Sequence, residues 1–513
     1  MLARVGRRYP ATQPGGVTLL RPRAQVYEGA GTGRRARGWR APTVGANDGV
    51  LGSLATLRDR SRAAIRNDGW ARGAIDRLVT NIVGSGIKPL AKATDPEFRA
   101  ALQALWLTWT DFSDADGLLD WYGQQAQAVR CWLEAGEVFV RLRARLPEDG
   151  LPVPLQVQLI EPEFCPHTHN GTNGGNRIRA GIEFSPIGQR AAYWMYRQRP
   201  GDLQDMDVTQ LVRVPADAVI HLFDPVRPGQ IRGIPQLTQA LVKITDLNRF
   251  DDATLIRQQL SNLFVGFLKR PAGVGDADVD PLTGKLISTT DDQAMVALEP
   301  GIWQELAPGE DVAFSDPPDI GNTYEMFMRQ QLLAVAAAAD VPYEILTGDL
   351  TKITDRTVRI ILNEFRRRIQ QRQHHIVAYQ FCRPVWTRWI AQAILAGALA
   401  VPTGYFEDPE PWQRVKWMAQ GWDYIHPVQD VQAHREAVRA GFRSRSEVVS
   451  ELGEDAEVID RENAEDNARA DALGLTYDSD ARNDSSSSAA STEPPDREDG
   501  DGTPRRFPPM VSH

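Results

Sequence analysis

The amino-acid sequence predicts an α+β fold of several structural units that includes long helices. With 513 residues the chain is too long for one hydrophobic core, because single cores stop growing at roughly 250 to 300 residues. Segments with a period of two are concentrated between residues 137 and 223, and this period is typical of half-buried strands. A helical segment of about 30 residues follows Pro235, which is long for an ordinary globular domain.

The composition is that of a packed protein that stays inside the cell. Hydrophobic residues make up 42% of the chain, which is enough for globular cores, but no run of roughly 18 apolar residues predicts a membrane span. The N-terminus is basic and lacks the apolar stretch of a signal peptide. Cys131, Cys165 and Cys382 are scattered, so we expect isolated reduced thiols.

Charge is distributed unevenly along the chain, whose formal net charge is −9. Residues 1–40 contain nine arginines and one acid, Glu28, whereas residues 471–513 contain nine acids and four arginines. A basic arm is typical of contact with nucleic acid or an acidic partner, and equally of a solvated, disordered segment. The overall acidity argues against tight DNA binding, since that requires many Lys and Arg side chains to neutralise phosphates.

An α+β unit is predicted over residues 51–225. The preceding residues 1–50 are rich in Gly, Arg and Pro, and we expect a basic, partly disordered arm. Apolar spacing predicts helical structure over 51–86, 96–109 and 119–135. Alternation predicts strands over 137–146 and 153–160. A hairpin that turns at Ser185–Gly188 is predicted over 181–197, and one more strand over 218–223.

Long helices dominate the second half of the chain. Proline suits the first turn of the helix after Pro235, whose apolar stripe is Leu237, Leu241, Ile244 and Leu247. A β-rich insertion is predicted over about 271–320, and a helix follows over 324–339.

A second long helical stretch is predicted over 354–398, interrupted at Pro384, which should kink or break it. Its apolar stripe is Val358, Leu362, Phe365 and Ile369, and its basic residues are Arg356, Arg359, Arg366, Arg367, Arg368 and Arg372. Two or three short helices are expected over 411–470, before a low-complexity tail that we expect to be disordered.

No catalytic motif is complete in the sequence. The nearest approach to a phosphate-binding loop is "VDPLTGKL", in which Val279 replaces the first glycine and Leu286 replaces the hydroxyl residue that would hold magnesium. A Gly-x-Ser-x-Gly nucleophile motif is lacking, and the spacing of the carboxylates does not single out a magnesium cluster. We therefore predict no catalytic residue, no cofactor and no enzymatic activity.

One histidine pair has a spacing that is compatible with a metal site. His167 and His169 lie beside Cys165 and Glu163, and alternate residues of a strand share a face. The surrounding sequence "EFCPHTHNGTNGGN" is typical of a loop, in which such a pair is usually just exposed. We predict no metal ligands here.

Six regions, in order, resemble the lambda-type portal family of tailed bacteriophages. The most specific is "VPADAVIHLFDPVRPGQIRGIPQL" (214–237). The others are "LRDRSRAAIRNDGWARGAIDRLVTNIVGSGIKP" (57–89), "QLIEPE" with "GIEFSPIGQRAAYWMY" (158–163 and 181–196), "LEPGIWQELAPGEDVAFSDPP" (298–318), "VPYEILTGDLT" (341–351) and "GWDYIHPVQDVQAHREAVRAGFRSRSEVVSELGED" (421–455). The resemblance covers roughly residues 50–465, with departures at "KITDRTVR" and at His426-Pro427.

The resemblance implies a subunit of a dodecameric ring at one vertex of the capsid, through which DNA is packaged and ejected. It implies as partners further copies of the chain, terminase, capsid and scaffold proteins, head-completion and tail proteins, and double-stranded DNA passing through non-specifically. The product would be a virion protein assembled in the host cytoplasm. The implied parts are a wing (51–235), stem helices (236–340) with a clip (about 271–320), a channel-proximal segment and basic helix (341–400), and a crown (401–470), between the arm (1–50) and the acidic tail (471–513).

Two sets of residues are candidates for this role. Lys352, Arg356 and Arg359 are the DNA-channel candidates, because they precede or begin the basic helix, although its arginines could equally bridge subunits. Gly229, Gly233 and Pro235 form a candidate structural hinge, since the glycines turn the chain out of a strand and the proline begins the long helix.

Two other classes of function stay open. A nuclease or ATPase of a packaging module would need an acidic metal cluster or a phosphate loop. Another structural head protein is disfavoured by the long helix after Pro235 and by the order of the motifs.

Overall fold

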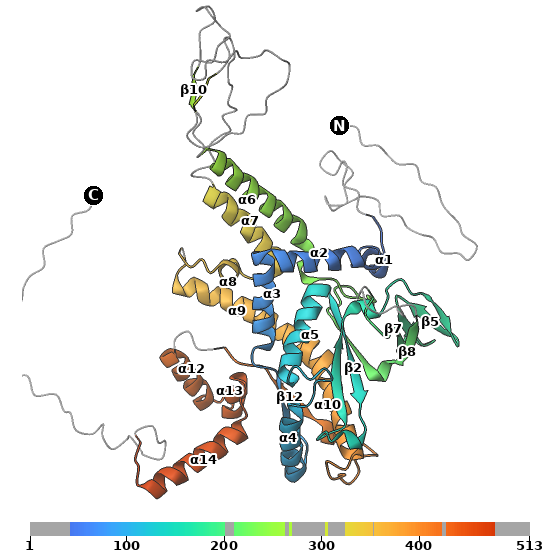
Figure 1. The fold of residues 1–513 in the computed structure, drawn as a ribbon. Helices are drawn as coiled ribbons and strands as arrows, with labels where there is room; N and C mark the ends of the chain where they lie inside the picture. Colours follow the sequence, from blue (N-terminus) through green and yellow to red (C-terminus); the bar gives the residue numbers. More distant parts are fainter. Residues whose placement is uncertain are drawn as a thin grey trace, which may run out of the picture.

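A helical body with two sheets at one side, a projecting helix pair and a C-terminal group of helices make up the protein (Figure 1). The computed structural model describes residues 42–200, 210–261, 266–268, 303–305, 324–351, 353–422 and 427–477. No described helix is long and apolar enough to cross a membrane.

The helical pattern predicted over 51–86 is divided between separate helices. They are α1 (Ala46–Leu51), α2 (Leu54–Asn67) and α3 (Gly69–Val83). The break falls at Asp68, whose backbone is extended and whose side chain accepts a hydrogen bond from the N–H of Ala71 at 2.5 Å. An aspartate in this position satisfies a free N–H at the start of the next helix, so it begins α3 and ends α2.

A cluster of buried tryptophans joins segments that lie far apart in the sequence. Helices α4 (Pro96–Thr110) and α5 (Trp121–Ala135) confirm the two predicted helices and pack against α10 (Arg383–Leu395). The members of the cluster are fully buried, with ring centroids 4.9 to 6.0 Å apart: Trp106, Trp109, Trp121, Trp386 and Trp389. Aromatic residues bury the most apolar area per side chain, so this cluster is a major part of the core.

A three-stranded antiparallel sheet divides the core into two layers. Its strands are β2 (Glu137–Ala144), β3 (Leu155–Ile160) and β9 (Val219–Phe223), in the order β3-β2-β9. One face, which includes Val138, Val140 and Leu222, packs on the helices. The other face, which includes Phe139 and Val219, packs on the second sheet. All three strands were predicted, β2 and β3 by their alternation.

The second sheet is an antiparallel meander at the side of the molecule. Its strands are β4 (Gly171–Asn173), β5 (Asn176–Arg179), β6 (Ile182–Phe184), β7 (Arg190–Tyr196) and β8 (Leu211–Pro215). The predicted hairpin is confirmed as β6 and β7, which join through a turn at Ser185–Gly188. Short 3₁₀ turns occupy Pro147–Asp149, Pro162–Phe164 and Ala216–Ala218.

The helix predicted after Pro235 is present, and its last predicted residues lie outside the described residues. A 3₁₀ turn, η6 (Gln236–Gln239), comes first, and the α-helix α6 (Leu241–Ser261) has 21 residues. Helix α7 (Tyr324–Ala339) has the predicted bounds and lies beside α6, where Phe250 contacts Tyr324 and Phe327. Of the predicted insertion, the structure describes β11 (Trp303–Glu305), which pairs with β10 (Gly266–Leu268); the rest lies outside the described residues.

The second long helical stretch is continuous but changes its hydrogen-bonding pattern. Helix α9 (Asp355–Arg372) passes into a π-helix, η8 (Gln373–Cys382), and then into α10, where Pro384 stands in the first turn. Proline lacks an N–H, but Pro384 does not break the stretch as predicted, because the π-helix passes directly into α10. The short helix α8 (Tyr343–Thr347) lies between α7 and α9.

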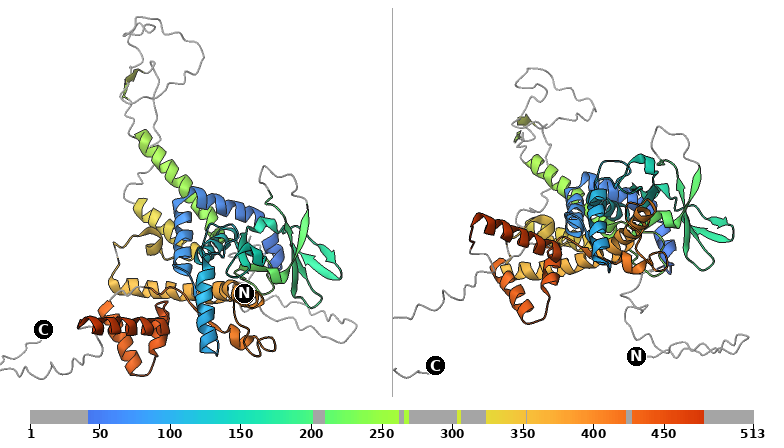
Figure 2. Two further views of the ribbon diagram at one scale, coloured as in Figure 1. Left: turned by 60° about the horizontal axis from the view of Figure 1, so that its bottom comes forward. Right: turned by 90° about the horizontal axis from the view of Figure 1, so that it is seen from below.

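Helices follow in the region where two or three short ones were predicted, together with a strand that was missed. They are α12 (Pro427–Arg439), α13 (Arg445–Glu451) and α14 (Ala456–Leu473), set apart from the sheets in all views (Figures 1 and 2). Before them come α11 (Glu410–Gln413) and the missed strand β12 (Val415–Met418), which pairs with β1 (Lys88–Ala91). Four-residue strands carry too little alternation to be recognised.

Candidate functional site: a buried ion network and a basic groove

A fully buried ion pair lies at the point where the sheets meet the long helix. Glu137 is the first residue of β2, and Arg232 lies in the loop between β9 and η6. The Arg232 Nη2 atom is 2.7 Å from Glu137 Oε1, and its Nε atom is 2.9 and 3.0 Å from the two carboxylate oxygens. Both side chains have 0% exposure. A bidentate pair is the geometry in which guanidinium and carboxylate bind most strongly.

Arg58, Glu163 and His221 extend this pair into a larger network of hydrogen bonds. We call the five residues the Glu137 network: Arg58, Glu137, Glu163, His221 and Arg232. From α2, Arg58 donates to Glu137 at 2.9 Å and to Glu163 at 3.3 Å. Arg232 also donates to the carbonyls of Ala180 at 2.8 Å and Cys165 at 3.0 Å. The network therefore joins α2, β2, β9, the loop after β3 and the turn between β5 and β6.

His221 contributes a neutral donor to the network. Its ring is stacked between Phe139 and Phe223, with centroids 4.4 and 4.6 Å away. Burial lowers the pKa of His221 to about 4, so the ring is uncharged at neutral pH and its Nε2–H donates to Glu137 at 2.9 Å. Burial by itself would raise the pKa of Glu137, but Arg232 and His221 outweigh this and hold it well below its usual value.

The three candidate hinge residues lie next to the network in different settings. At Gly233 an added Cβ would stand 1.9 Å from the carbonyl oxygen of Gly136, so a side chain there meets backbone. The N–H of Gly233 donates to Glu137 at 3.0 Å. Gly229 has φ +79° with open space around it, a conformation that favours glycine, and Pro235 directly precedes η6.

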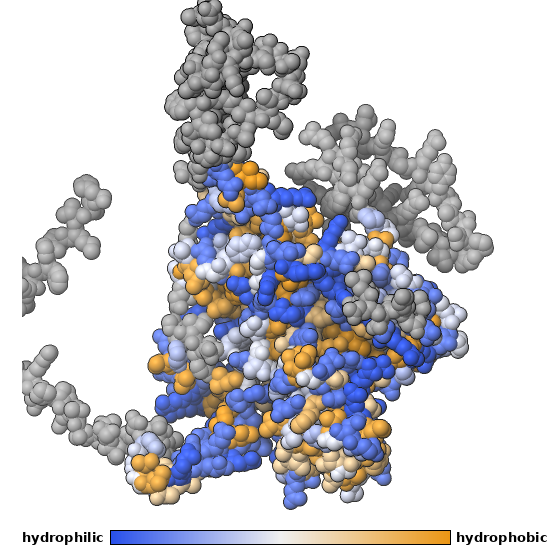
Figure 3. Space-filling model, viewed as in Figure 1, coloured by the Kyte–Doolittle hydropathy of each residue, from blue (hydrophilic) through white to orange (hydrophobic). Residues whose placement is uncertain are grey.

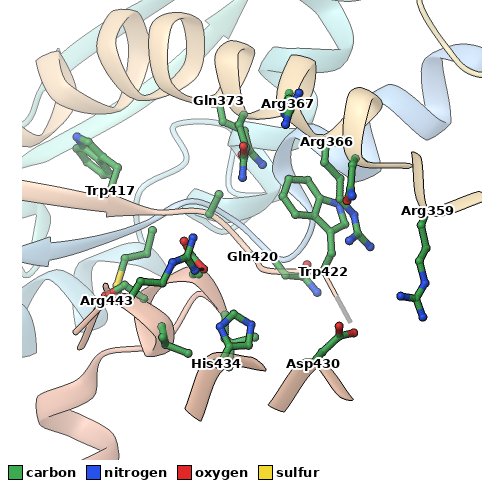
Figure 4. Close-up of a pocket in the computed structure, with 18 residues that line it drawn as sticks. Arg359, Arg366, Arg367, Gln373, Trp417, Gln420, Trp422, Asp430, His434 and Arg443 are labelled. Atoms are coloured by element: carbon green, nitrogen blue, oxygen red, sulfur yellow. Dashed lines mark hydrogen bonds and ion pairs between the residues drawn. The ribbon is translucent and has the colours of Figure 1, made fainter. Parts of the chain in front are cut away.

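The basic face of α9 borders a groove that lies between α9 and the C-terminal helices. This basic groove has a volume of about 630 Å³ and is lined by residues of α9, α12, α13 and the segment after β12. Arg359 and Arg366 point from α9 toward Asp430 and His434 of α12 (Figure 4). The Arg366 guanidinium lies over the ring of Trp422, 5.3 Å from its centroid.

The structure separates the arginines of the basic helix into different environments. Arg356 is exposed, Arg359 is half-buried in the basic groove, and Lys352 lies outside the described residues. Arg368 and Arg372 pair instead with Asp340, which follows α7, the latter at 3.1 Å. The sequence did not point to Arg443 or Trp422 as groove residues, because each lies at least 50 positions from α9.

The histidine pair and the cysteines show no reactive arrangement. Within the described ranges, no group of three or more His, Cys, Asp or Glu side chains could hold a metal ion. Burial raises the pKa of the Cys165 thiol to about 11, so it remains protonated at neutral pH. The three cysteines are free, as expected from their spacing.

Comparisons with known proteins give matches along most of the chain. Residues 32–373 match the family described as "Phage portal protein, lambda family". The "Probable portal protein" of Halomonas phage phiHAP-1 is 26% identical over 82% of this chain and 81% of its own length. "Portal protein B" of Escherichia phage lambda is 22% identical over 90% and 93%. A structure described as "Neck of native GTA particle computed with C12 symmetry" is 14% identical, with a TM-score of 0.38, covering 79% of this chain and 94% of that one.

Removal of Arg232 should leave the Glu137 carboxylate buried with insufficient compensation. We expect Arg232→Met to lower the free energy of unfolding in urea by about 3–5 kcal/mol. Adding Glu137→Gln should recover part of the loss, because the uncompensated charge disappears. Arg66→Met, at an exposed position, is the matched control. A change below about 1 kcal/mol in Arg232→Met would contradict the central role of the pair.

Gly233 should not tolerate a side chain. Gly233→Val places atoms against the Gly136 carbonyl, and we expect a loss of about 3 kcal/mol or more of stability, or no soluble protein. Gly69→Val is the control, since an added Cβ at Gly69 meets nothing within 4 Å. Equal unfolding midpoints for the two variants would show that the close approach to Gly136 does not constrain the fold.

Proposed function

This chain belongs to the lambda family of phage portal proteins, and on that premise we propose that twelve copies form a ring at one capsid vertex. The family match, which spans residues 32–373, is the observation that carries the proposal. As a portal protein the chain is a structural component of the virion. We propose that the ring is the channel through which double-stranded DNA enters during packaging and leaves at ejection.

The described shape supports a division of the chain into the parts of a ring subunit. We propose that the two sheets and α1–α5, within residues 51–235, form the wing. Helices α6 and α7 project from the body as an antiparallel pair (Figure 1), which suits stem helices within 236–340 that lead to a clip at about 271–320. Residues 341–400 would then approach the channel, and 401–470 would form the crown.

Exposed apolar side chains on the helix pair support lateral contacts between copies. Val242, Leu255 and Ile256 on α6 and Met326 on α7 are each more than half exposed, and hydrophobic surface is visible where the pair projects (Figure 3). Apolar surface that a single chain leaves exposed marks an interaction site. Contacts that repeat from one copy to the next under rotation close into a ring.

The channel-facing role is proposed for α9 and the segment before it. Helices α8 and α9 lie on the side of the molecule opposite the five-stranded sheet (Figure 1), so α9 would face inward if the sheets face outward. Lys352, Arg356 and Arg359 would contact DNA phosphates without reading sequence. The net charge of −9 would keep such contacts few, and few contacts release few counterions and let DNA slide.

The hinge and the outside partners complete the proposal. Gly229, Gly233 and Pro235 would set the direction in which the stem leaves the wing, because Gly233 is locked against Gly136. We propose that the ring is also the docking platform for terminase during packaging, and later for head-completion and tail proteins, with capsid and scaffold proteins around it. The family is structural, and we propose that the chain itself has no enzymatic activity.

The ring should be visible directly. Purified full-length protein, viewed by negative-stain electron microscopy, should show radially symmetric particles with a central hole, and class averages should have twelvefold symmetry. Replacing Val242, Leu255 and Ile256 together with serine should shift the protein toward monomers, because these side chains would lose their apolar contacts. Monomers of the unaltered chain at all concentrations would count against the proposal.

Reversal or removal of charge at the channel candidates should slow DNA movement and leave the ring intact. We expect Arg356→Glu and Arg359→Gln to reduce in vitro packaging of DNA into proheads several-fold, since each change weakens attraction to phosphate. Arg66→Glu makes a comparable charge change at an exposed position on α2 and should package normally. If Arg356→Glu and Arg359→Gln rings package DNA at the rate of the unaltered ring, the channel assignment is wrong.

A further inference from the structure

Strand β9 is an edge strand, and a groove runs along its open side. It pairs with β2 alone among the described strands, in the order β3-β2-β9. All five of its residues, Val219–Phe223, are buried. An edge strand presents main-chain N–H and C=O groups that can pair with another chain.

The main-chain groups of β9 alternate between β2 and the open side. The N–H of Phe223 donates to the side chain of Gln380 at 3.3 Å, and the N–H of Val219 donates to the carbonyl of Ala216. Both therefore point away from β2. By the alternation of an antiparallel ladder, the N–H and C=O of His221 point the same way. Outside the β2–β9 ladder, neither group has a main-chain partner among the described residues.

The groove along this edge is large and has an apolar floor. Its volume is about 1010 Å³, and it lies between β9, β7 and the helical segment of η8 and α10. We call it the β9 groove. Its apolar lining comprises Leu142, Tyr193, Ile220, Phe223, Pro384 and Ala391. Such a lining can receive apolar side chains from a strand laid beside β9.

The rim of the β9 groove is positively charged. Arg190, Arg383 and Arg388 line it, against one acid, Asp217. In the described part of the chain none of these three arginines forms an ion pair. Arg190 lies over the ring of Phe223 at 5.5 Å and Arg383 over that of Tyr379 at 5.8 Å, so both are held at the groove by aromatic neighbours. The charge of the rim complements carboxylates.

We propose that the β9 groove binds an extended, acidic segment of a partner protein, which adds to β9 as a further strand. Alternate side chains of a strand point to opposite sides, so one set would enter the apolar floor and the other would place carboxylates at the arginines. This chemistry excludes the chain's own basic N-terminal segment, whose residues 1–40 contain nine arginines. The site goes beyond the ring and its channel, since it lies on the sheet side of α10.

A defined peptide tests the proposal. The probe is a fluorescein-labelled peptide in which valine and glutamate alternate, titrated with full-length protein and followed by fluorescence anisotropy. We expect saturable binding at micromolar concentrations. Binding should weaken at least tenfold for a peptide in which lysine replaces glutamate, and at least tenfold when the backbone amides that face β9 are N-methylated.

Protein variants locate the binding. Arg383→Glu, at an exposed position, and Arg388→Glu should each weaken binding of the valine–glutamate peptide at least tenfold, while Arg66→Glu should not. Circular dichroism and the unfolding midpoint show whether each variant keeps its fold. Because Arg383 is exposed, Arg383→Glu should keep the fold, and it tests the proposal even if Arg388→Glu proves unstable.

Several outcomes would overturn the proposal. Absence of saturable binding would do so, as would equal affinities for the lysine and glutamate peptides. Unchanged affinity of the Arg383→Glu variant for the valine–glutamate peptide would also overturn it. Equal affinity of the N-methylated and unmethylated peptides would mean that the peptide binds by charge alone, without adding to β9 as a strand. Displacement of the probe by a short DNA duplex would identify a nucleic-acid site instead. Tighter binding of a synthetic peptide of residues 478–501 than of the probe would assign the groove to the chain's own acidic tail.

Discussion

The Glu137 carboxylate is buried with no exposure, and the surrounding fold must keep it compensated. A buried charge is costly unless it is paired and hydrogen-bonded. Arg232, Arg58, His221 and the N–H of Gly233 supply that compensation. They come from α2, from β9 and from the loop that contains both Arg232 and Gly233. Displacing any one of these segments would leave the Glu137 carboxylate without one of its partners. The network therefore fixes the positions of α2, the sheets and the loop that leads to α6 relative to one another.

The start of the helix pair is fixed by residues next to the Glu137 network. Gly233 follows Arg232 directly and packs backbone to backbone against Gly136, which precedes Glu137. Pro235 then begins η6, and Leu237 enters the helical core with no exposure. The sheet and the helix pair are thereby rigidly connected over a few residues. For a ring subunit this matters, because an error in the direction of the helix pair would be repeated in every copy.

Helix α10 is packed more firmly against the body of the molecule than the C-terminal helices are. The tryptophan cluster fastens α10 to α4 and α5 through fully buried rings. The C-terminal helices have few buried residues, and exposed pairs such as Lys88–Glu454 and Arg99–Glu457 connect them to the body. Exposed pairs contribute roughly 0–1 kcal/mol each. The body should therefore be the stable part, while α12–α14 can adjust their position against neighbouring copies.

The sequence by itself determined the helices, the alternating strands, the hairpin and the family, because periodicity and motif order are local properties. It also singled out "RPGQIRGIP", but only as a turn into a helix. Tertiary structure decided that Arg232 within this segment is buried against Glu137, 95 residues away, and that α9 faces Trp422 and the C-terminal helices. It also decided that β9 is an edge strand. Ion pairing, groove formation and strand order depend on which distant segments meet, and no local pattern records that.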